Sequence, residues 1–177
     1  MTDKDQPDDL GSRLVAALPQ MRRYALAVSR HGDMADELVQ EACERALASQ
    51  GPGDPATPLL PWLFTIIRNR WVDRQRRVRT EGTTIDIDEH EEVVVSGGED
   101  ERVDTRMTLE RVQLAIDRLQ PEQRELLLLV CVEQLSYKEA ATVTGVPIGT
   151  VMSRLARARM RVAEWAGLTP GPGALQR

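Results

Sequence analysis

The stretch that decides the fold is LSYKEAATVTGVPIGTVMSRLARAR, residues 135–159. It reads as a short helix, the turn VPIG, and a second helix that is rich in arginine. Ser136 and Glu139 have the spacing of a capping box, which marks the start of the first helix. Two helices joined by a short glycine-containing turn are typical of the helix-turn-helix motif.

The second helix of this motif divides into two faces at about 100° per residue. One face is apolar and is predicted to pack within its domain; it consists of Ile148, Val151, Leu155, Ala158 and Val162. Arg159 lies beside this face. The opposing face is polar and basic: Thr150, Ser153, Arg154, Arg157 and Arg161. No Asp or Glu lies between Glu139 and Glu164, so these arginines lack local ion-pair partners. A solvated basic face is the plain alternative, but hydroxyls and arginines near the start of such a helix favour contacts with phosphates and base edges.

The charge of the chain is uneven. The formal net charge is -5, and it divides into zero for residues 1–77, -7 for 78–106 and +2 for 107–177. The acidic middle segment contains three glycines, and its runs IDID and EEVVV have no partner strands. We therefore expect a flexible acidic linker at 78–106, extended by its own charge repulsion.

The remaining segments predict an all-α protein of two small helical domains. Apolar residues make up 41% of the chain and aromatic residues only 3%, which favours the small aliphatic contacts typical of helical bundles. The domains are expected at 13–77 and 107–167, with disordered ends at 1–12 and 168–177.

The N-terminal domain contains three segments with helical periodicity. In the first, from about Leu14 to Arg30, apolar residues recur at Leu14, Leu18, Met21, Ala25 and Val28. The second is predicted to start at Asp33 as its N-cap. Its apolar stripe consists of Ala35, Leu38, Val39, Ala42, Cys43, Ala46 and Leu47. A proline-rich loop at 50–60 precedes the third, which places Pro61 in its first turn.

The C-terminal domain is expected to contain three or four helices. One helix near 108–119 has an apolar face made of Leu109, Val112, Ala115, Ile116 and Leu119. A leucine-rich central helix is predicted over 121–134. The two cysteines, Cys43 and Cys131, lie in apolar helical patterns and are predicted to be buried and reduced rather than disulfide-bonded or metal-bound.

Residues 135–159 resemble region four of the extracytoplasmic-function (ECF) sigma factors, which are bacterial transcription-initiation subunits. The resemblance rests on the Ser-Tyr-x-Glu opening of the first helix and on Pro-x-Gly-Thr-Val-x-Ser-Arg-Leu-x-Arg-Ala-Arg around the second. The stretches LPQMRRYALAVSRHGDMADELVQEACERAL and PWLFTIIRNRWVDRQRR are similar to region two of the same family. Two departures are Ala140, where the family usually has Ile, and Met152, where Lys or Arg is common.

The resemblance implies a sigma factor that binds core RNA polymerase and promoter DNA and is controlled by an anti-sigma factor. It implies contacts with the −35 element from Thr150, Met152, Ser153, Arg154, Ala156, Arg157 and Arg161. It implies contacts with the −10 element from Asn69, Arg70, Arg74, Arg76 and Arg77, and capture of a flipped base by the loop at 50–60. It implies polymerase contacts from Asp36, Glu37, Gln40 and Glu41. The alternative for the acidic residues is that they are simply solvated. The alternative for the basic cluster is that it stabilises the C-terminal end of its helix, where the helix dipole is negative.

Other classes of function find little support in the sequence. The chain has two histidines, no glycine-rich phosphate loop and no cysteine pair at metal spacing, so we expect no enzyme, cofactor, metal or small-molecule substrate. No stretch reaches the roughly 18 apolar residues of a membrane span and no secretory signal opens the chain, which predicts a cytoplasmic protein. Two alternatives are a sigma-like decoy that binds an anti-sigma factor without reading promoters, and an operator-binding repressor. The repressor would leave the N-terminal resemblance unexplained.

Overall fold

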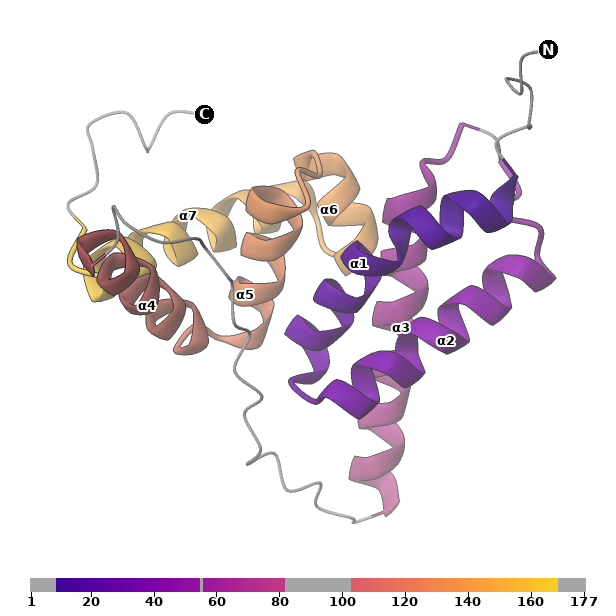
Figure 1. Ribbon diagram of the computed structural model, residues 1–177, viewed down its shortest axis with the longest axis horizontal. Coiled ribbons are helices and arrows are strands. Elements are labelled where there is room, and N and C mark those ends of the chain that lie inside the picture. Colours follow the sequence, from indigo (N-terminus) through magenta and orange to yellow (C-terminus); the bar gives the residue numbers. More distant parts are fainter. Residues whose placement is uncertain (1–8, 55, 82–102, 169–177) are drawn as a thin grey trace. The chain divides into compact units, whose positions relative to one another are not determined.

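The computed structural model describes residues 9–54, 56–81 and 103–168, which form two helical units (Figure 1). These residues contain helices and turns and no strand, which confirms the all-α prediction. Most of the predicted linker, including IDID and EEVVV, and most of the two predicted disordered ends lie outside the described residues. None of the helices in the described ranges combines the length and the apolar character needed to traverse a lipid bilayer.

Helices α1 (Leu10–Ser29), α2 (Gly32–Ala48) and α3 (Leu59–Glu81) pack on one another in the N-terminal unit (Figure 1). The rings of Tyr24 and Phe64 lie 4.6 Å apart, centroid to centroid, as a tilted aromatic pair that joins α1 to α3. The largest fully buried side chains of the unit are Met21, Tyr24, Leu38, Leu63, Phe64 and Ile67. Burial of each such side chain contributes roughly 1.5–3 kcal/mol, so this core holds the three helices together.

The start of α2 differs from the prediction. The N-cap is His31, whose backbone is extended (φ -134°, ψ 127°), and the predicted N-cap Asp33 lies in the first turn instead. The cause lies in the short link after α1. There Arg30 takes a left-handed backbone (φ 63°), and the Ser29 hydroxyl donates to the carbonyl of His31 at 3.1 Å. These two features place His31 directly before the helix, so α2 begins at Gly32.

Helix α1 starts at Leu10, before the predicted start near Leu14. Two contacts extend it. The backbone N–H of Arg13 donates to the carbonyl of Asp9 at 3.1 Å, and the side chain of Leu10 lies over Gly51 of the α2–α3 loop. The loop contact joins residues far apart in the chain, so helical periodicity could not indicate it.

The loop from Ser49 to Pro58 connects α2 to α3. Gly51 is buried in it with a left-handed backbone (φ 94°), and its N–H donates to the carbonyl of Ala46 at 2.9 Å. Helix α3 then begins at Leu59 with Pro61 in its first turn, as predicted, and it continues to Glu81, beyond the predicted domain end at 77.

The C-terminal unit consists of α4 (Val103–Asp117), α5 (Pro121–Leu127), the π-helical turn η1 (Leu128–Val132), α6 (Tyr137–Thr144) and α7 (Ile148–Trp165) (Figure 1). Helix α7 packs against α4 and α5. Buried side chains of these elements include Ala115, Leu119, Leu126, Leu129, Val151, Leu155 and Ala158.

The predicted central helix over 121–134 is helical only as far as Val132, and it changes type after Leu127. The α-helical pattern ends at Leu127, and a π turn follows in which the N–H of Glu133 donates to the carbonyl of Leu128 at 3.0 Å. A π turn accommodates an extra residue, which changes the direction of the side chains that follow. Gln134 then takes a left-handed backbone (φ 58°) and ends the turn.

Several side chains that were expected to pack are exposed. The exposed fractions are 38% for Leu18, 55% for Leu47, 53% for Leu109 and 50% for Ile148. An apolar stripe can be wider than the strip of helix surface that the neighbouring helices cover, so residues at its edges and ends stay in water.

The two cysteines are free and differ in environment. The predicted burial is wrong for Cys131, which is exposed in the π turn, and Cys43 is half-buried. Burial, with a smaller contribution from Glu44, raises the pKa of the Cys43 thiol above its ordinary value.

Candidate DNA and polymerase interfaces

The start of α6 is held by the capping box that the sequence predicts. The Ser136 hydroxyl oxygen accepts from the N–H of Glu139 at 3.2 Å, and the Glu139 carboxylate accepts from the N–H of Ser136 at 2.8 Å. The carboxylate also accepts from the Ser136 hydroxyl at 2.6 Å. These hydrogen bonds, the side-chain one foremost, lower the pKa of Glu139 below its ordinary value.

The turn between α6 and α7 is short, as the motif requires. Gly145 ends α6 with a left-handed backbone (φ 66°), and its N–H donates to the carbonyl of Ala141 at 2.9 Å. Pro147 precedes α7, and its carbonyl accepts from Thr150 at 2.8 Å and from Val151 at 3.1 Å. The helix-turn-helix layout is therefore confirmed, and α7 is its second helix.

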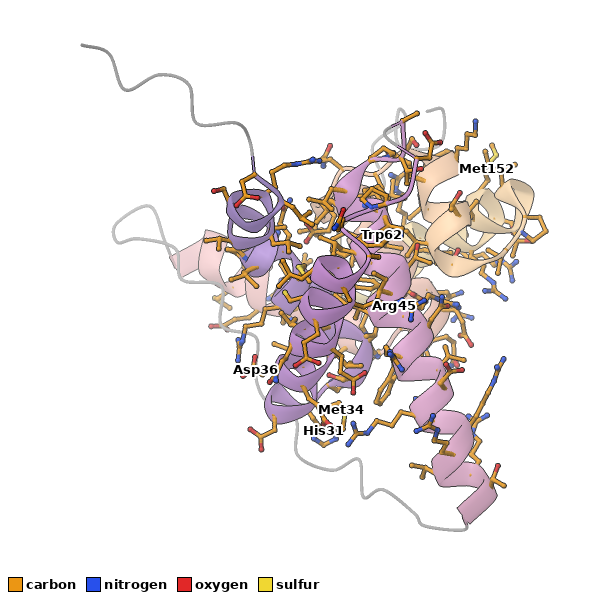
Figure 2. All side chains as sticks on the ribbon, turned by 90° about the vertical axis from the view of Figure 1, so that its right-hand side faces the viewer. His31, Met34, Asp36, Arg45, Trp62 and Met152 are labelled. Atoms are coloured by element: carbon orange, nitrogen blue, oxygen red, sulfur yellow. The ribbon has the colours of Figure 1, made fainter. Side chains whose placement is uncertain are left out.

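Helix α7 exposes a mixed polar and apolar face. Its exposed residues from Met152 to Met160 are Met152, Ser153, Ala156, Arg157 and Met160. Met152, which is labelled in Figure 2, is 52% exposed. The Arg157 guanidinium donates to the backbone carbonyl of Ser153 at 3.2 Å and lies 3.5 Å from its hydroxyl oxygen. The Ser153 hydroxyl donates to the carbonyl of Thr150 at 3.1 Å. Ser153 and Arg157 are thus joined to each other on this face, and Ser153 is also joined to the backbone of Thr150.

The other two arginines of the predicted DNA face differ from Arg157. Arg154 is half-buried and forms no hydrogen bond or ion pair with the described part of the chain. Arg161 is also half-buried, and its guanidinium donates to the side-chain oxygen of Gln123 on α5 at 3.1 Å. The same group lies 5.9 Å from the ring centroid of Trp165. Arg161 therefore takes part in packing α7 onto α5.

Arg159 lies beside the packing face, as the helical periodicity predicts. Its guanidinium is 3.5 Å from the sulfur of Cys131, a contact that raises the pKa of Arg159 above its ordinary value while partial burial opposes the rise. Of the four arginines of α7, Arg159 and Arg161 therefore contact their own domain, whereas Arg157 is exposed on the predicted DNA face and Arg154 is half-buried.

In the N-terminal unit, the residues predicted to bind polymerase and those predicted to bind the −10 element meet. The carboxylate of Glu37 on α2 lies 2.8 Å from the guanidinium of Arg74 on α3. The carboxylate of Glu41 lies 3.4 Å from the guanidinium of Arg70. The sequence assigned these side chains to two different partners, but the fold makes them one surface of alternating charge.

The remaining predicted residues of this unit lie around that surface. Asp36, which is labelled in Figure 2, pairs with Arg22 of α1 at 2.7 Å. Gln40 donates to Glu44 at 2.9 Å. Asn69, Arg76 and Arg77 are exposed on α3, where Arg76 lies 3.8 Å from Asp73. Sequence reasoning missed Arg22, because only the packing of α1 against α2 brings it to Asp36.

The loop predicted to capture a base is partly ordered by its own side chains. Asp54 accepts from the N–H of Ala56 at 2.9 Å through its carboxylate and from the N–H of Thr57 at 3.0 Å through its backbone carbonyl. Trp62 follows at the start of α3 with a half-buried ring (Figure 2). The roles of the loop and of all the predicted contact residues stay predictions.

Comparison with known proteins agrees with this architecture. The sequence-family model described as Sigma-70 region 2 matches residues 14–81, and that described as Sigma-70, region 4 matches residues 109–162. The chain is 35% identical over 156 residues to the ECF RNA polymerase sigma factor EcfG of Rhodopseudomonas palustris (strain TIE-1), covering 88% of this chain and 84% of that protein. It is 32% identical over 148 residues to the ECF RNA polymerase sigma factor SigM of Mycobacterium tuberculosis, covering 84% and 72%.

A solved structure is also similar to this chain. The sigma factor RpoE from Bartonella quintana, crystallised with the anti-sigma factor NepR, is 32% identical to this chain with a TM-score of 0.71. The match covers 90% of this chain and 98% of that one.

Proposed function

This chain belongs to the extracytoplasmic-function family of RNA polymerase sigma factors and directs transcription initiation, and on that premise we propose which surface meets each partner. Helix α7 enters the major groove of the −35 element. Helices α2 and α3 bind core polymerase and the −10 element. The chain is an initiation factor and not an enzyme, and it acts in the cytoplasm, where polymerase and chromosome are found.

The observation that carries the −35 assignment is the exposed face of α7 that follows a short capped helix. Thr150, Ser153 and Arg157 supply hydroxyl and guanidinium donors there, and such groups contact phosphates and base edges. An arginine that chelates a guanine discriminates against the wrong base by ~1–3 kcal/mol. Arg154 has no partner in the described part of its own chain and supports the same role.

The −10 assignment is supported by the row of exposed side chains on α3. Asn69, Arg76 and Arg77 line the same helix as Arg70 and Arg74, and a positively charged groove is what single-stranded DNA needs from a protein. The acidic side chains of α2 beside this row suit a cationic surface of polymerase.

An anti-sigma factor is the expected regulator. The structurally similar RpoE of Bartonella quintana forms a complex with the anti-sigma factor NepR. We propose that this chain is sequestered by a protein of the same class, which covers the surfaces named above until a signal releases them.

In vitro transcription tests the proposal. Core RNA polymerase with this protein should initiate on a pool of native promoter fragments on which core alone does not. Arg157→Ala should lower −35-dependent initiation about tenfold, the loss expected for one base-reading arginine, while core binding is unchanged. Arg159→Ala is the matched control, because it removes the same charge from the same helix on the side that faces Cys131. Tight anti-sigma binding without any initiation would instead identify a decoy.

A further inference from the structure

The ion pairs between α2 and α3 form an antiparallel ladder. Glu37 and Glu41 are one helical turn apart on α2, and Arg70 and Arg74 are one turn apart on α3. They pair in opposite order, Glu37 with Arg74 at 2.8 Å and Glu41 with Arg70 at 3.4 Å. All four side chains are between 36% and 48% exposed, so each pair is open to a competing ligand.

We propose that Glu37 and Glu41 shield Arg70 and Arg74 from nucleic acid in the free protein, and that a cationic surface of core polymerase takes over the two carboxylates and releases the arginines to DNA. The inference rests on the proposed function, since it assigns the acidic side chains to polymerase and the arginines to the −10 strand. It adds which carboxylates hold the two arginines in the free protein.

The chemistry makes the two states exclusive. A guanidinium binds a carboxylate or a phosphate through the same planar set of N–H donors, so an arginine held by Glu37 or Glu41 is not free for the same contact with DNA. Exposed ion pairs contribute little to stability, because water solvates both charges and salt screens them. The ladder is therefore weak enough to be exchanged by a partner that supplies several charges at once.

Linkage makes the coupling reciprocal. If polymerase releases the arginines and so tightens DNA binding, DNA bound to the arginines must tighten polymerase binding by the same factor. The ladder would thus disfavour free sigma factor on DNA and favour the ternary complex.

The chain offers a matched control on the same helix. Asp33 and Glu44 are exposed acids of α2, and neither forms an ion pair with an arginine in the described parts of the chain. Glu44 instead accepts a hydrogen bond from Gln40 at 2.9 Å. Asp33→Asn/Glu44→Gln removes the same two charges as Glu37→Gln/Glu41→Gln but leaves the ladder intact.

The experiment measures binding of the full chain, without polymerase, to a fluorescein-labelled single-stranded oligonucleotide of about 20 nucleotides, longer than one binding groove requires. Fluorescence anisotropy gives the affinity over a series of salt concentrations. Glu37→Gln/Glu41→Gln should bind roughly three- to tenfold more tightly than the parent. Two released arginines should steepen the slope of log affinity against log salt by about 1.4, since each phosphate contact on single-stranded DNA contributes about 0.7. The control variant should gain little affinity, and its slope of log affinity against log salt should equal that of the parent.

A second pair of substitutions tests whether the gain comes from these arginines. Adding Arg70→Gln/Arg74→Gln to Glu37→Gln/Glu41→Gln should abolish both the gain in affinity and the added slope. The proposal is overturned if the control variant gains as much as the ladder variant, if neither gains, or if the gain survives loss of the arginines. Failure of the protein to initiate transcription would instead count against the proposed function, whatever the DNA affinities are.

Discussion

The guanidinium of Arg161 on α7 donates a hydrogen bond of 3.1 Å to the side-chain oxygen of Gln123 on α5. Gln123 is only 7% exposed, so this oxygen has little access to water. Arg161, which the sequence pattern assigns to DNA, therefore also joins α7 to α5. Arg157, one turn earlier on α7, hydrogen-bonds only to Ser153 among the residues that the structure describes.

This difference predicts unequal effects on stability. Arg161→Ala should lower the free energy of unfolding of the C-terminal unit by about 1–2 kcal/mol, because the Gln123 oxygen loses a charged donor. Arg157→Ala should change it by less than about 0.5 kcal/mol, as expected for an exposed side chain. Urea unfolding followed by circular dichroism measures both, and equal stability of the two variants would show that the Arg161–Gln123 contact contributes nothing.

Met152 should recognise a methyl group rather than a hydrogen-bonding edge. Its side chain is 52% exposed on α7 and apolar, and apolar side chains in the major groove contact the C5-methyl group of thymine. Replacing the thymines of the −35 element by deoxyuridine should weaken binding of the parent protein roughly fourfold, in line with about 0.8 kcal/mol for one buried methyl-sized group.

The Met152→Ala variant should bind the thymine DNA and the deoxyuridine DNA with equal affinity. Met160→Ala is the control, because Met160 is equally exposed but lies two turns further from the start of the helix. If the parent protein binds the thymine and the deoxyuridine DNA equally, Met152 does not contact a thymine methyl group.

The capping box of α6 predicts a pH dependence. Because its hydrogen bonds lower the pKa of Glu139 in the folded state, they stabilise the fold at any pH above the ordinary glutamate value. That stability is lost as the pH falls from the ordinary value through the lower folded value. Glu139→Gln should remove this part of the acid dependence, and Ser136→Ala should cost about 1 kcal/mol near neutral pH. Acid titrations of unfolding at fixed urea test both.

Replacing Gly51 should destabilise the protein, whereas replacing Gly53 should not. Gly51 has a left-handed backbone (φ 94°), so Gly51→Ala should destabilise the N-terminal unit by roughly 1–2 kcal/mol. A side chain at Gly53 would meet nothing within 4 Å, so Gly53→Ala should be nearly neutral. Thermal unfolding of the two variants gives the comparison, and a Gly51→Ala protein as stable as the parent would contradict the strain argument.

Much of the fold could be predicted because it depends on local pattern. The capping box joins residues three apart, and the helix-turn-helix follows from two helical periods with a turn between them. The start of α2 and the end of α5 could not be predicted, because each depends on a backbone detail, the left-handed Arg30 and the π turn at Leu128–Val132. Neither detail leaves a periodic trace in the sequence.

By itself, the sequence determined which residues share a helix face and which family the motifs resemble, because helical spacing and short motifs are properties of neighbouring residues. Only the tertiary structure decided which charges meet. Glu37 faces Arg74, and Arg161 reaches Gln123, 38 residues away in the chain. Such contacts depend on how helices pack, and packing is set by the combined fit of many side chains rather than by any local stretch.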